Sequence, residues 1–168
     1  MSVLNCPILL VEDNPMDVDL TRRAFARHSL ASFLEVARDG EEALDCLARW
    51  EAGEPLPTVI LLDLHLPKLS GLEVLRRLKA HERFRTIPVV VLTTSAEDLD
   101  IQTAYRLGAN SYIVKPVDFD TFMQVAGQIE LYWCTLNAVP QKSLWAVDRR
   151  EGLPAFHQLI QLPLRLLG

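Results

Sequence analysis

A short run of consecutive apolar residues, Val59–Leu62, is followed directly by an aspartate, Asp63. Four such residues between Pro57 and an acid are typical of a strand that is buried on both faces, as in the interior of a parallel sheet. The carboxyl ends of these strands form the edge at which open α/β sheets build their functional sites. We therefore expect Asp63 to be held at a strand end, facing solvent, and interpret it as the residue at which chemistry takes place.

The same order of strand and helix repeats along the chain. Apolar runs predict further strands at 7–11, 33–37, 87–92 and 111–114, and apolar residues at three- and four-residue spacing predict helices at 15–28, 41–50, 71–81, 96–107 and 118–136. This alternation indicates an α/β fold, a doubly wound five-stranded parallel sheet with five helices on its two faces. Ser95 is the expected N-cap of the fourth helix, and Gly108 its left-handed stop.

Length and charge limit the classes of protein that the chain can form. Its 168 residues have room for one domain and a small excess, which we divide into a domain at 1–140 and a C-terminal segment at 141–168 with no separate output domain. Prolines and glycines interrupt residues 141–168, so packing on the domain, packing on a partner and mobility all stay open. The net charge of −5 and the lack of long Lys/Arg runs argue against direct nucleic-acid binding.

Targeting signals and cysteines bear on the compartment. The chain shows no signal peptide and no apolar stretch near the ~18 residues that a membrane span needs, so we expect a cytoplasmic protein without membrane contact. Cys6, Cys46 and Cys134 are odd in number and lack the spacing of a metal site. We interpret them as reduced thiols that mostly fill the core.

Polar residues follow four of the predicted strands and should meet at one edge of the sheet. They are Glu12 and Asp13 after the first strand, Asp63 after the third, Thr93 after the fourth and Lys115 after the fifth. Three converging carboxylates repel one another unless a divalent cation lies among them, and oxygen ligands favour Mg²⁺. A lysine ammonium and a threonine hydroxyl can bind phosphoryl oxygens. The set predicts phosphoryl transfer in which Asp63 is the nucleophile and forms an acyl phosphate.

The motifs that contain these residues resemble the receiver domain of two-component response regulators. They are Leu10-Val-Glu12-Asp13-Asn14, Leu62-Asp63-Leu-His-Leu-Pro67 with Gly71, Leu92-Thr93-Thr94 and Tyr112-Ile-Val-Lys115-Pro116. The resemblance covers residues 6–136 and implies a flavodoxin-like sheet with the receiver strand order 2-1-3-4-5. It also implies that Asp63 accepts its phosphoryl group from the phosphohistidine of a sensor histidine kinase.

The resemblance implies roles for the other site residues as well. The Mg²⁺ ligands that it implies are Glu12, Asp13, Asp63 and the backbone carbonyl of His65. Lys115 would bind the phosphoryl oxygens, and the Lys115–Pro116 peptide bond would be cis. Thr93 and Tyr112 are similar to the switch pair of the family, in which the threonine moves toward the phosphoryl group and the aromatic ring turns inward behind it.

Further details are similar to the small stand-alone regulators that are paired with bacterial phytochrome histidine kinases. These details are Glu130-Leu-Tyr-Trp133, Ala138-Val-Pro140 and the long loop around 50–57. Such regulators often form dimers through the fourth and fifth helices, and the apolar flank of the last predicted helix exceeds what one packed face needs. We therefore expect a homodimer, phytochrome-type signalling, and a bacteriophytochrome as the kinase.

Other classes of protein explain the residues less well. A nucleotide- or flavin-binding enzyme should carry a glycine-rich loop after its first strand, and residues 12–16 contain no glycine. A phosphatase with an aspartate nucleophile would want a second aspartate at position 65, which is His65. We expect a protein that is not an enzyme, a phosphoacceptor that takes part in its own phosphorylation and dephosphorylation and acts as an interaction switch or relay. The alternative is a phosphorylation-independent interaction module with the same fold.

Overall fold

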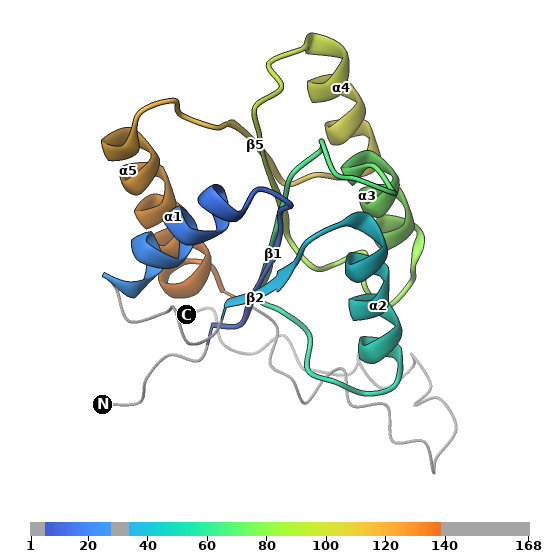
Figure 1. Ribbon diagram of the computed structural model, residues 1–168. Coiled ribbons are helices and arrows are strands. Elements are labelled where there is room, and N and C mark those ends of the chain that lie inside the picture. The colour runs from blue at the N-terminus through green and yellow to red at the C-terminus, as the bar shows by residue number, and fades with distance from the viewer. Residues whose placement is uncertain (1–5, 28–33, 139–168) are drawn as a thin grey trace, which may run out of the picture. The chain divides into compact units, whose positions relative to one another are not determined.

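The computed structural model describes residues 6–27 and 34–138, and within them five strands alternate with five α-helices before a final π-helix (Figure 1). The strands are β1 (Ile8–Val11), β2 (Leu34–Ala37), β3 (Val59–Leu62), β4 (Val89–Thr93) and β5 (Ser111–Val114). The helices are α1 (Pro15–Ala26), α2 (Gly40–Glu51), α3 (Gly71–Ala80), α4 (Asp98–Leu107), α5 (Phe119–Glu130) and η2 (Leu131–Leu136). In this part of the chain no helix is long and apolar enough to cross a membrane. The predicted segment 141–168 lies outside the described residues.

All five strands run parallel in the order β2-β1-β3-β4-β5, which confirms the predicted sheet. β1 lies between β2 and β3, where Leu10 pairs with Val36 on one side and with Leu61 on the other. β3 is buried along its whole length, as its unbroken apolar run predicts. Because the strands are parallel, the residues that follow them meet at a single edge of the sheet.

Alternate residues of each strand pack into two separate cores, one on each face of the sheet. Leu9 contributes to the core that includes Trp50 and is covered by α2, α3 and α4. Leu10 contributes to the core that includes Phe25 and is covered by α1 and α5. Figure 1 shows these two groups of helices on opposite sides of the strands. Burial of both faces explains why the strands contain few polar residues.

The start of α4 differs from the prediction. Its N-cap is Glu97, which makes no capping hydrogen bond through its side chain, rather than Ser95. The Ser95 hydroxyl instead accepts from Glu97 N at 3.3 Å and donates to Asp100 Oδ2 at 2.6 Å. A hydroxyl engaged in this way holds the preceding segment outside the helix, so α4 begins later. Gly108 ends the helix with φ 101°, as predicted.

The last predicted helix, 118–136, is two helices of different geometry. The α-helix ends at Glu130, and a π-helix continues to Leu136, where Asn137 N donates to Tyr132 O at 2.7 Å. Apolar residues at three- and four-residue spacing do not distinguish the two geometries here, because the six residues of η2 are too few to reveal a change in the number of residues per turn.

A disulfide joins Cys6 to Cys134, so the prediction of three reduced thiols is wrong for this pair. Cys6 precedes the interior strand β1, and Cys134 lies in η2, directly after α5, which packs on the same face of the sheet; their Cα atoms are 5.5 Å apart. The two cysteines are 128 residues apart in the sequence. Such a pair carries no spacing motif, and only the fold reveals it. Cys46 is free and buried.

Candidate functional site

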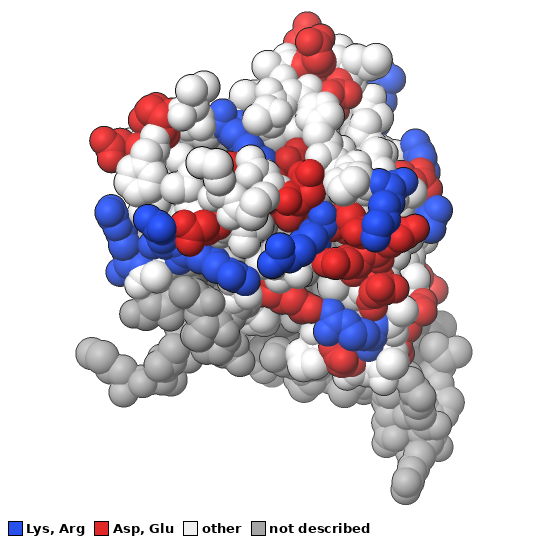
Figure 2. Space-filling model, viewed as in Figure 1, with Lys and Arg blue, Asp and Glu red and all other residues white. Residues whose placement is uncertain are grey.

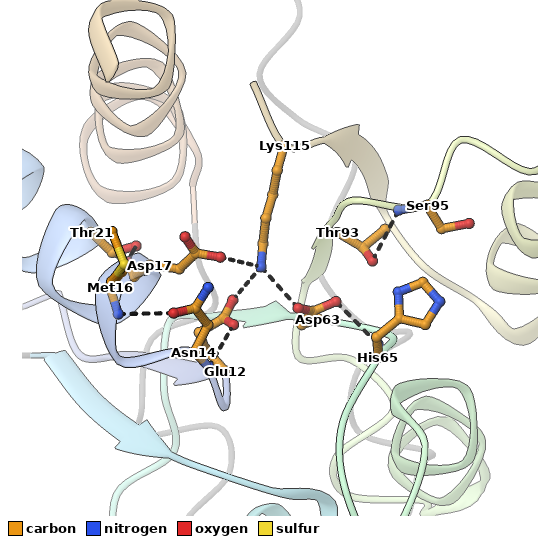
Figure 3. A network of polar contacts seen from close by, with 10 residues as sticks. All are labelled: Glu12, Asn14, Met16, Asp17, Thr21, Asp63, His65, Thr93, Ser95 and Lys115. Atoms are coloured by element: carbon orange, nitrogen blue, oxygen red, sulfur yellow. Dashed lines mark hydrogen bonds and ion pairs between the residues drawn. The ribbon is translucent and has the colours of Figure 1, made fainter. Parts of the chain in front are cut away.

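The acids that follow β1 and β3 converge at the carboxyl edge of the sheet. Oxygen atoms of Glu12, Asp13 and Asp63 all lie within 4.8 Å of one another. Asp13 is exposed, whereas Glu12 is 2% and Asp63 5% accessible. The prediction that Asp63 faces solvent is therefore wrong. Its carboxylate is covered because the side chain of Lys115 extends across it from the end of β5 (Figure 3).

Lys115 connects three carboxylates. Its backbone N–H donates to Thr93 O at 2.7 Å, which continues the pairing of β5 with β4 and directs the side chain along the edge. The Nζ atom donates to Glu12 Oε2 at 2.5 Å, to Asp63 Oδ2 at 2.8 Å and to Asp17 Oδ2 at 2.9 Å. Burial by itself lowers the pKa of Lys115, but these hydrogen bonds outweigh it, so the pKa lies above its ordinary value and the side chain is cationic.

The pKa of Glu12 also lies above its ordinary value, but for a different reason. Burial raises its pKa from 4.5 to about 7, although the hydrogen bond from Lys115 works against the rise. Its second oxygen, Oε1, accepts from Asn14 N at 3.1 Å. Glu12 is thus a carboxylate that an added positive charge would hold in its ionised form.

The donor set fits a hard divalent cation. Glu12, Asp13 and Asp63 offer only oxygen atoms, and the ammonium of Lys115 contacts two of these carboxylates together with that of Asp17. An excess of negative charge on clustered oxygen ligands suits Mg²⁺ or Mn²⁺. His65 N donates to Asp63 Oδ1 at 3.1 Å, which brings the backbone of the β3–α3 loop to the carboxylate of Asp63. The role of the His65 carbonyl as a ligand stays a prediction.

Gly71 allows the loop that contains His65 to fold back on the strand end. Its N–H donates to Leu64 O at 3.0 Å, and a Cβ at this position would lie 2.0 Å from Asp63 O. No residue with a side chain fits there without moving the backbone of Asp63. The glycine singled out by sequence is therefore required by close packing rather than by an unusual φ angle.

Lys68 fastens the same loop to the start of α2. Its Nζ contacts Asp39 Oδ2 at 2.6 Å and Glu41 Oε2 at 3.3 Å, and its backbone has a positive φ of 65°. The hydrogen bond from Lys68 lowers the pKa of Asp39, whose carboxylate also accepts from Glu42 N at the helix N-terminus. Sequence reasoning did not single out this contact, because nothing in either segment marks the other as its neighbour.

The two predicted switch residues meet at Ser95. Thr93 is fully buried, and its Oγ1 accepts from Ser95 N at 3.4 Å. The Tyr112 hydroxyl donates to Ser95 O at 3.0 Å, with its ring half-buried against the core beneath α4. Burial raises the pKa of this hydroxyl, which keeps it a donor. The structure thus brings Thr93 and Tyr112 to the same short segment, while their action as a switch stays a prediction.

The Lys115–Pro116 peptide bond is not cis, since the described residues contain no cis peptide bond. The expectation that came from the family resemblance is therefore wrong here. The trans form is the intrinsically preferred one by ~0.5–1 kcal/mol, and in it Lys115 makes both its backbone contact to β4 and its three carboxylate contacts.

Sequence reasoning missed Asp17 as a site residue. Asn14 Oδ1 accepts from Met16 N, and Pro15 begins α1 directly after the acids of β1. An acid in the first turn of such a helix still borders the sheet edge. That signal could have identified Asp17, but its partner at the site, Lys115, is 98 residues away in the sequence.

A doubly wound parallel sheet with an acid cluster, a buried threonine and a lysine at its carboxyl edge defines the class of aspartate phosphoacceptor domains. The chain belongs to the response regulator receiver domain family, whose model matches residues 8–126. It is 47% identical over 134 residues to the probable methanogenesis regulatory protein FilR2 of Methanothrix harundinacea, an alignment that covers 79% of this chain and 86% of FilR2.

Two further response regulators, Rcp1 and RcpA, are also similar to this chain. Response regulator Rcp1 of Synechocystis sp. is 36% identical over 135 residues, covering 79% of this chain and 92% of Rcp1. The crystal structure of a Mn(2+)-bound Rcp1 matches with a TM-score of 0.74 over 80% of this chain and 99% of that chain. The phosphorylated cyanobacterial phytochrome response regulator RcpA matches with a TM-score of 0.76 and 38% identity, over 81% of this chain and 99% of RcpA.

Proposed function

We propose that Asp63 accepts a phosphoryl group from the phosphohistidine of a sensor histidine kinase. The observation that carries the proposal is the buried Asp63 carboxylate held 2.8 Å from the Lys115 ammonium beside two further acids. A carboxylate oxygen of Asp63 would bond to phosphorus as the N–P bond of the phosphohistidine breaks, and the electron pair of that bond returns to the histidine nitrogen. Positioning and charge neutralisation are what this reaction requires of a protein.

The neighbouring side chains would bind the phosphoryl oxygens and the cation. Lys115 would bind phosphoryl oxygens with the ammonium that now contacts Asp63, and the Thr93 hydroxyl would donate to another. Glu12, Asp13, Asp63 and the His65 carbonyl would hold Mg²⁺, which supplies positive charge for the transferring group. The support for Mg²⁺ is the all-oxygen donor set, together with the Mn(2+) form of the related Rcp1.

The acyl phosphate would act as a switch through Ser95. A shift of Thr93 toward the phosphoryl group would break the hydrogen bond that its Oγ1 accepts from Ser95 N. Because Tyr112 donates to the carbonyl of the same serine, the ring would move with this segment and change the surface at the start of α4. The chain would then signal as a non-enzymatic interaction switch or relay.

The upstream partner is a kinase of the phytochrome type in this proposal. RcpA supports it, because that regulator is associated with a cyanobacterial phytochrome and aligns with most of this chain. FilR2 supports a second candidate, a kinase that responds to a signal other than light. FilR2 has a higher sequence identity to this chain than RcpA has, and it is named for the regulation of methanogenesis. In either case the phosphoryl chemistry at Asp63 is the same.

We further infer that the protein is cytoplasmic and forms a homodimer through its fourth and fifth helices. Apolar side chains lie exposed on α4 and on η2, which continues α5: Leu99 and Tyr105 on α4, and Leu131, Tyr132 and Leu136 on η2. Direct nucleic-acid binding is disfavoured by the net charge of −5. In Figure 2 basic side chains gather over α1 and acidic ones over α2, rather than in one basic stripe.

The test is the intact mass of the protein after incubation with acetyl phosphate and Mg²⁺, with Asp63→Asn as the matched variant. We expect one phosphoryl adduct on the parent, none on the variant, and none when EDTA is added first. Size measured on the same samples reports whether the adduct changes the oligomer. If purified cognate kinase as well as acetyl phosphate leaves the parent unmodified, the alternative of a phosphorylation-independent interaction module is favoured.

A further inference from the structure

The ammonium of Lys115 has all three of its N–H donors engaged by acids. Its partners are Glu12 at 2.5 Å, Asp63 at 2.8 Å and Asp17 at 2.9 Å, and the side chain of Lys115 is only 6% exposed (Figure 3). Glu12 and Asp63 come from strand ends, whereas Asp17 comes from the first turn of α1. The lysine is therefore held from both sides, by the sheet edge and by a helix.

The three partners differ in what else they can bind. Glu12 and Asp63 belong to the oxygen cluster that fits a divalent cation, and Asp17 does not. The other oxygens of that pair are also occupied, since Glu12 Oε1 accepts from Asn14 N and Asp63 Oδ1 accepts from His65 N. A cation and Lys115 must therefore share or compete for the same carboxylates. Asp17 stands outside this competition.

Asp17 is placed rigidly enough to serve as an independent anchor. Asn14 caps the helix that contains Asp17, and Pro15 is the first residue of that helix. The backbone carbonyl of Asp17 accepts from the Thr21 hydroxyl at 2.8 Å. Its side chain is 22% exposed, so water only partly screens its attraction to the lysine. An acid in the first helical turn also interacts favourably with the helix dipole, a role that needs no lysine.

We propose that Asp17 is a positioning residue that keeps Lys115 beside the phosphoacceptor while cation and phosphoryl group engage Glu12 and Asp63. This inference rests on the proposed function of Asp63. Without Asp17, the Lys115 ammonium would bind only Glu12 and Asp63, the carboxylates that a cation also needs, and would oppose cation binding. Once the cation and the phosphoryl group occupied those two carboxylates, no acid would hold Lys115 in the site. Asp17 thus acts through Lys115, and its effect should vanish when the lysine is absent.

The test compares Asp17→Asn with Asp19→Asn, each alone and combined with Lys115→Ala. Asp19→Asn removes the same charge from the same helix, where Asp19 is exposed and pairs with Arg23. Mn²⁺ affinity is measured by electron paramagnetic resonance, and the rate of adduct formation with acetyl phosphate at saturating Mg²⁺ by intact mass. Thermal unfolding of every variant separates a loss of fold from a loss of positioning.

We expect Asp17→Asn to weaken Mn²⁺ binding and to slow adduct formation by about tenfold each, the scale of a lost charge-assisted hydrogen bond. Asp19→Asn should match the parent in both, and in the Lys115→Ala background Asp17→Asn should change neither. Equal losses of Mn²⁺ affinity and of rate with and without Lys115 would mean that Asp17 acts only through its charge and not through the lysine, which would overturn the proposal. Identical behaviour of the Asp17→Asn and Asp19→Asn variants would overturn it as well. Absence of any adduct on the parent, with the cognate kinase as well as with acetyl phosphate, would instead overturn the proposed function, while the Mn²⁺ measurements still decide the role of Asp17.

Discussion

At the scale of single residues, Glu12 makes the stability of the domain depend on pH. Its pKa is raised from 4.5 to about 7 by burial, so the folded chain binds this proton more tightly than the unfolded chain. Between these two pH values folding takes up a proton at Glu12, so the contribution of this residue to the free energy of unfolding falls as pH rises. The shift corresponds to about 3 kcal/mol across the window.

We expect Glu12→Gln to remove this contribution, because glutamine cannot ionise. Urea unfolding at a series of pH values in EDTA would measure the slope for the parent, for Glu12→Gln and for Asp45→Asn, which changes an exposed acid. The slope between about pH 4.5 and pH 7 should flatten in Glu12→Gln alone. A parent slope preserved in Glu12→Gln would contradict the assignment of the raised pKa to this residue.

At the scale of elements, the loop between β3 and α3 depends on Gly71. A methyl group there would lie 2.0 Å from the carbonyl oxygen of Asp63 and 2.7 Å from Leu64 Cα, both of which belong to the backbone. We expect Gly71→Ala to lower the free energy of unfolding by about 2 kcal/mol or more and to weaken Mn²⁺ binding, because relief of the overlap must displace Asp63.

Ser70→Ala is the control for this loop. Ser70 Oγ accepts from Glu73 N at 3.3 Å and caps α3, so its loss should cost about 1 kcal/mol of stability through the helix alone. Cation affinity should stay at the parent value in Ser70→Ala and fall in Gly71→Ala. Parent-like Mn²⁺ affinity in Gly71→Ala would show that the loop relaxes without moving Asp63.

At the scale of the whole molecule, the disulfide closes almost the entire described chain into one covalent loop. Because Cys6 and Cys134 are 128 residues apart, reduction should lower the free energy of unfolding by about 5 kcal/mol on loop-closure entropy. Denatured protein purified without reductant should show one reactive thiol per chain, that of Cys46, out of three cysteines. Chemical denaturation with and without dithiothreitol gives the difference in stability.

Two variants check that the effect belongs to this pair. Dithiothreitol should have no effect on the stability of Cys134→Ser, and it should still destabilise Cys46→Ser. Three reactive thiols in the denatured, unreduced protein would mean that the bond does not form under those conditions. Disulfides persist in oxidising compartments, so the thiol count also bears on the proposed cytoplasmic location.

Local patterns in the sequence determined the type of fold and most of the site. Runs such as Val59–Leu62 are typical of strands buried on both faces, and their alternation with helices indicates parallel pairing. In a parallel sheet the residue after each strand is carried to one edge, so Glu12, Asp63, Thr93 and Lys115 could be grouped before their distances were known. The resemblance to receiver domains then supplied the strand order.

Only the tertiary structure decided which groups contact one another across long separations in the sequence. The burial of Asp63, its cover by Lys115, the contact of Asp17 with that lysine and the Cys6–Cys134 disulfide depend on side chains that lie between 52 and 128 residues apart. The periodicity of apolar residues indicates which face of a helix or strand is buried, but it does not indicate which other element packs against that face. Pairing of charges and thiols is set by where the packed elements place them, which is a property of the whole fold.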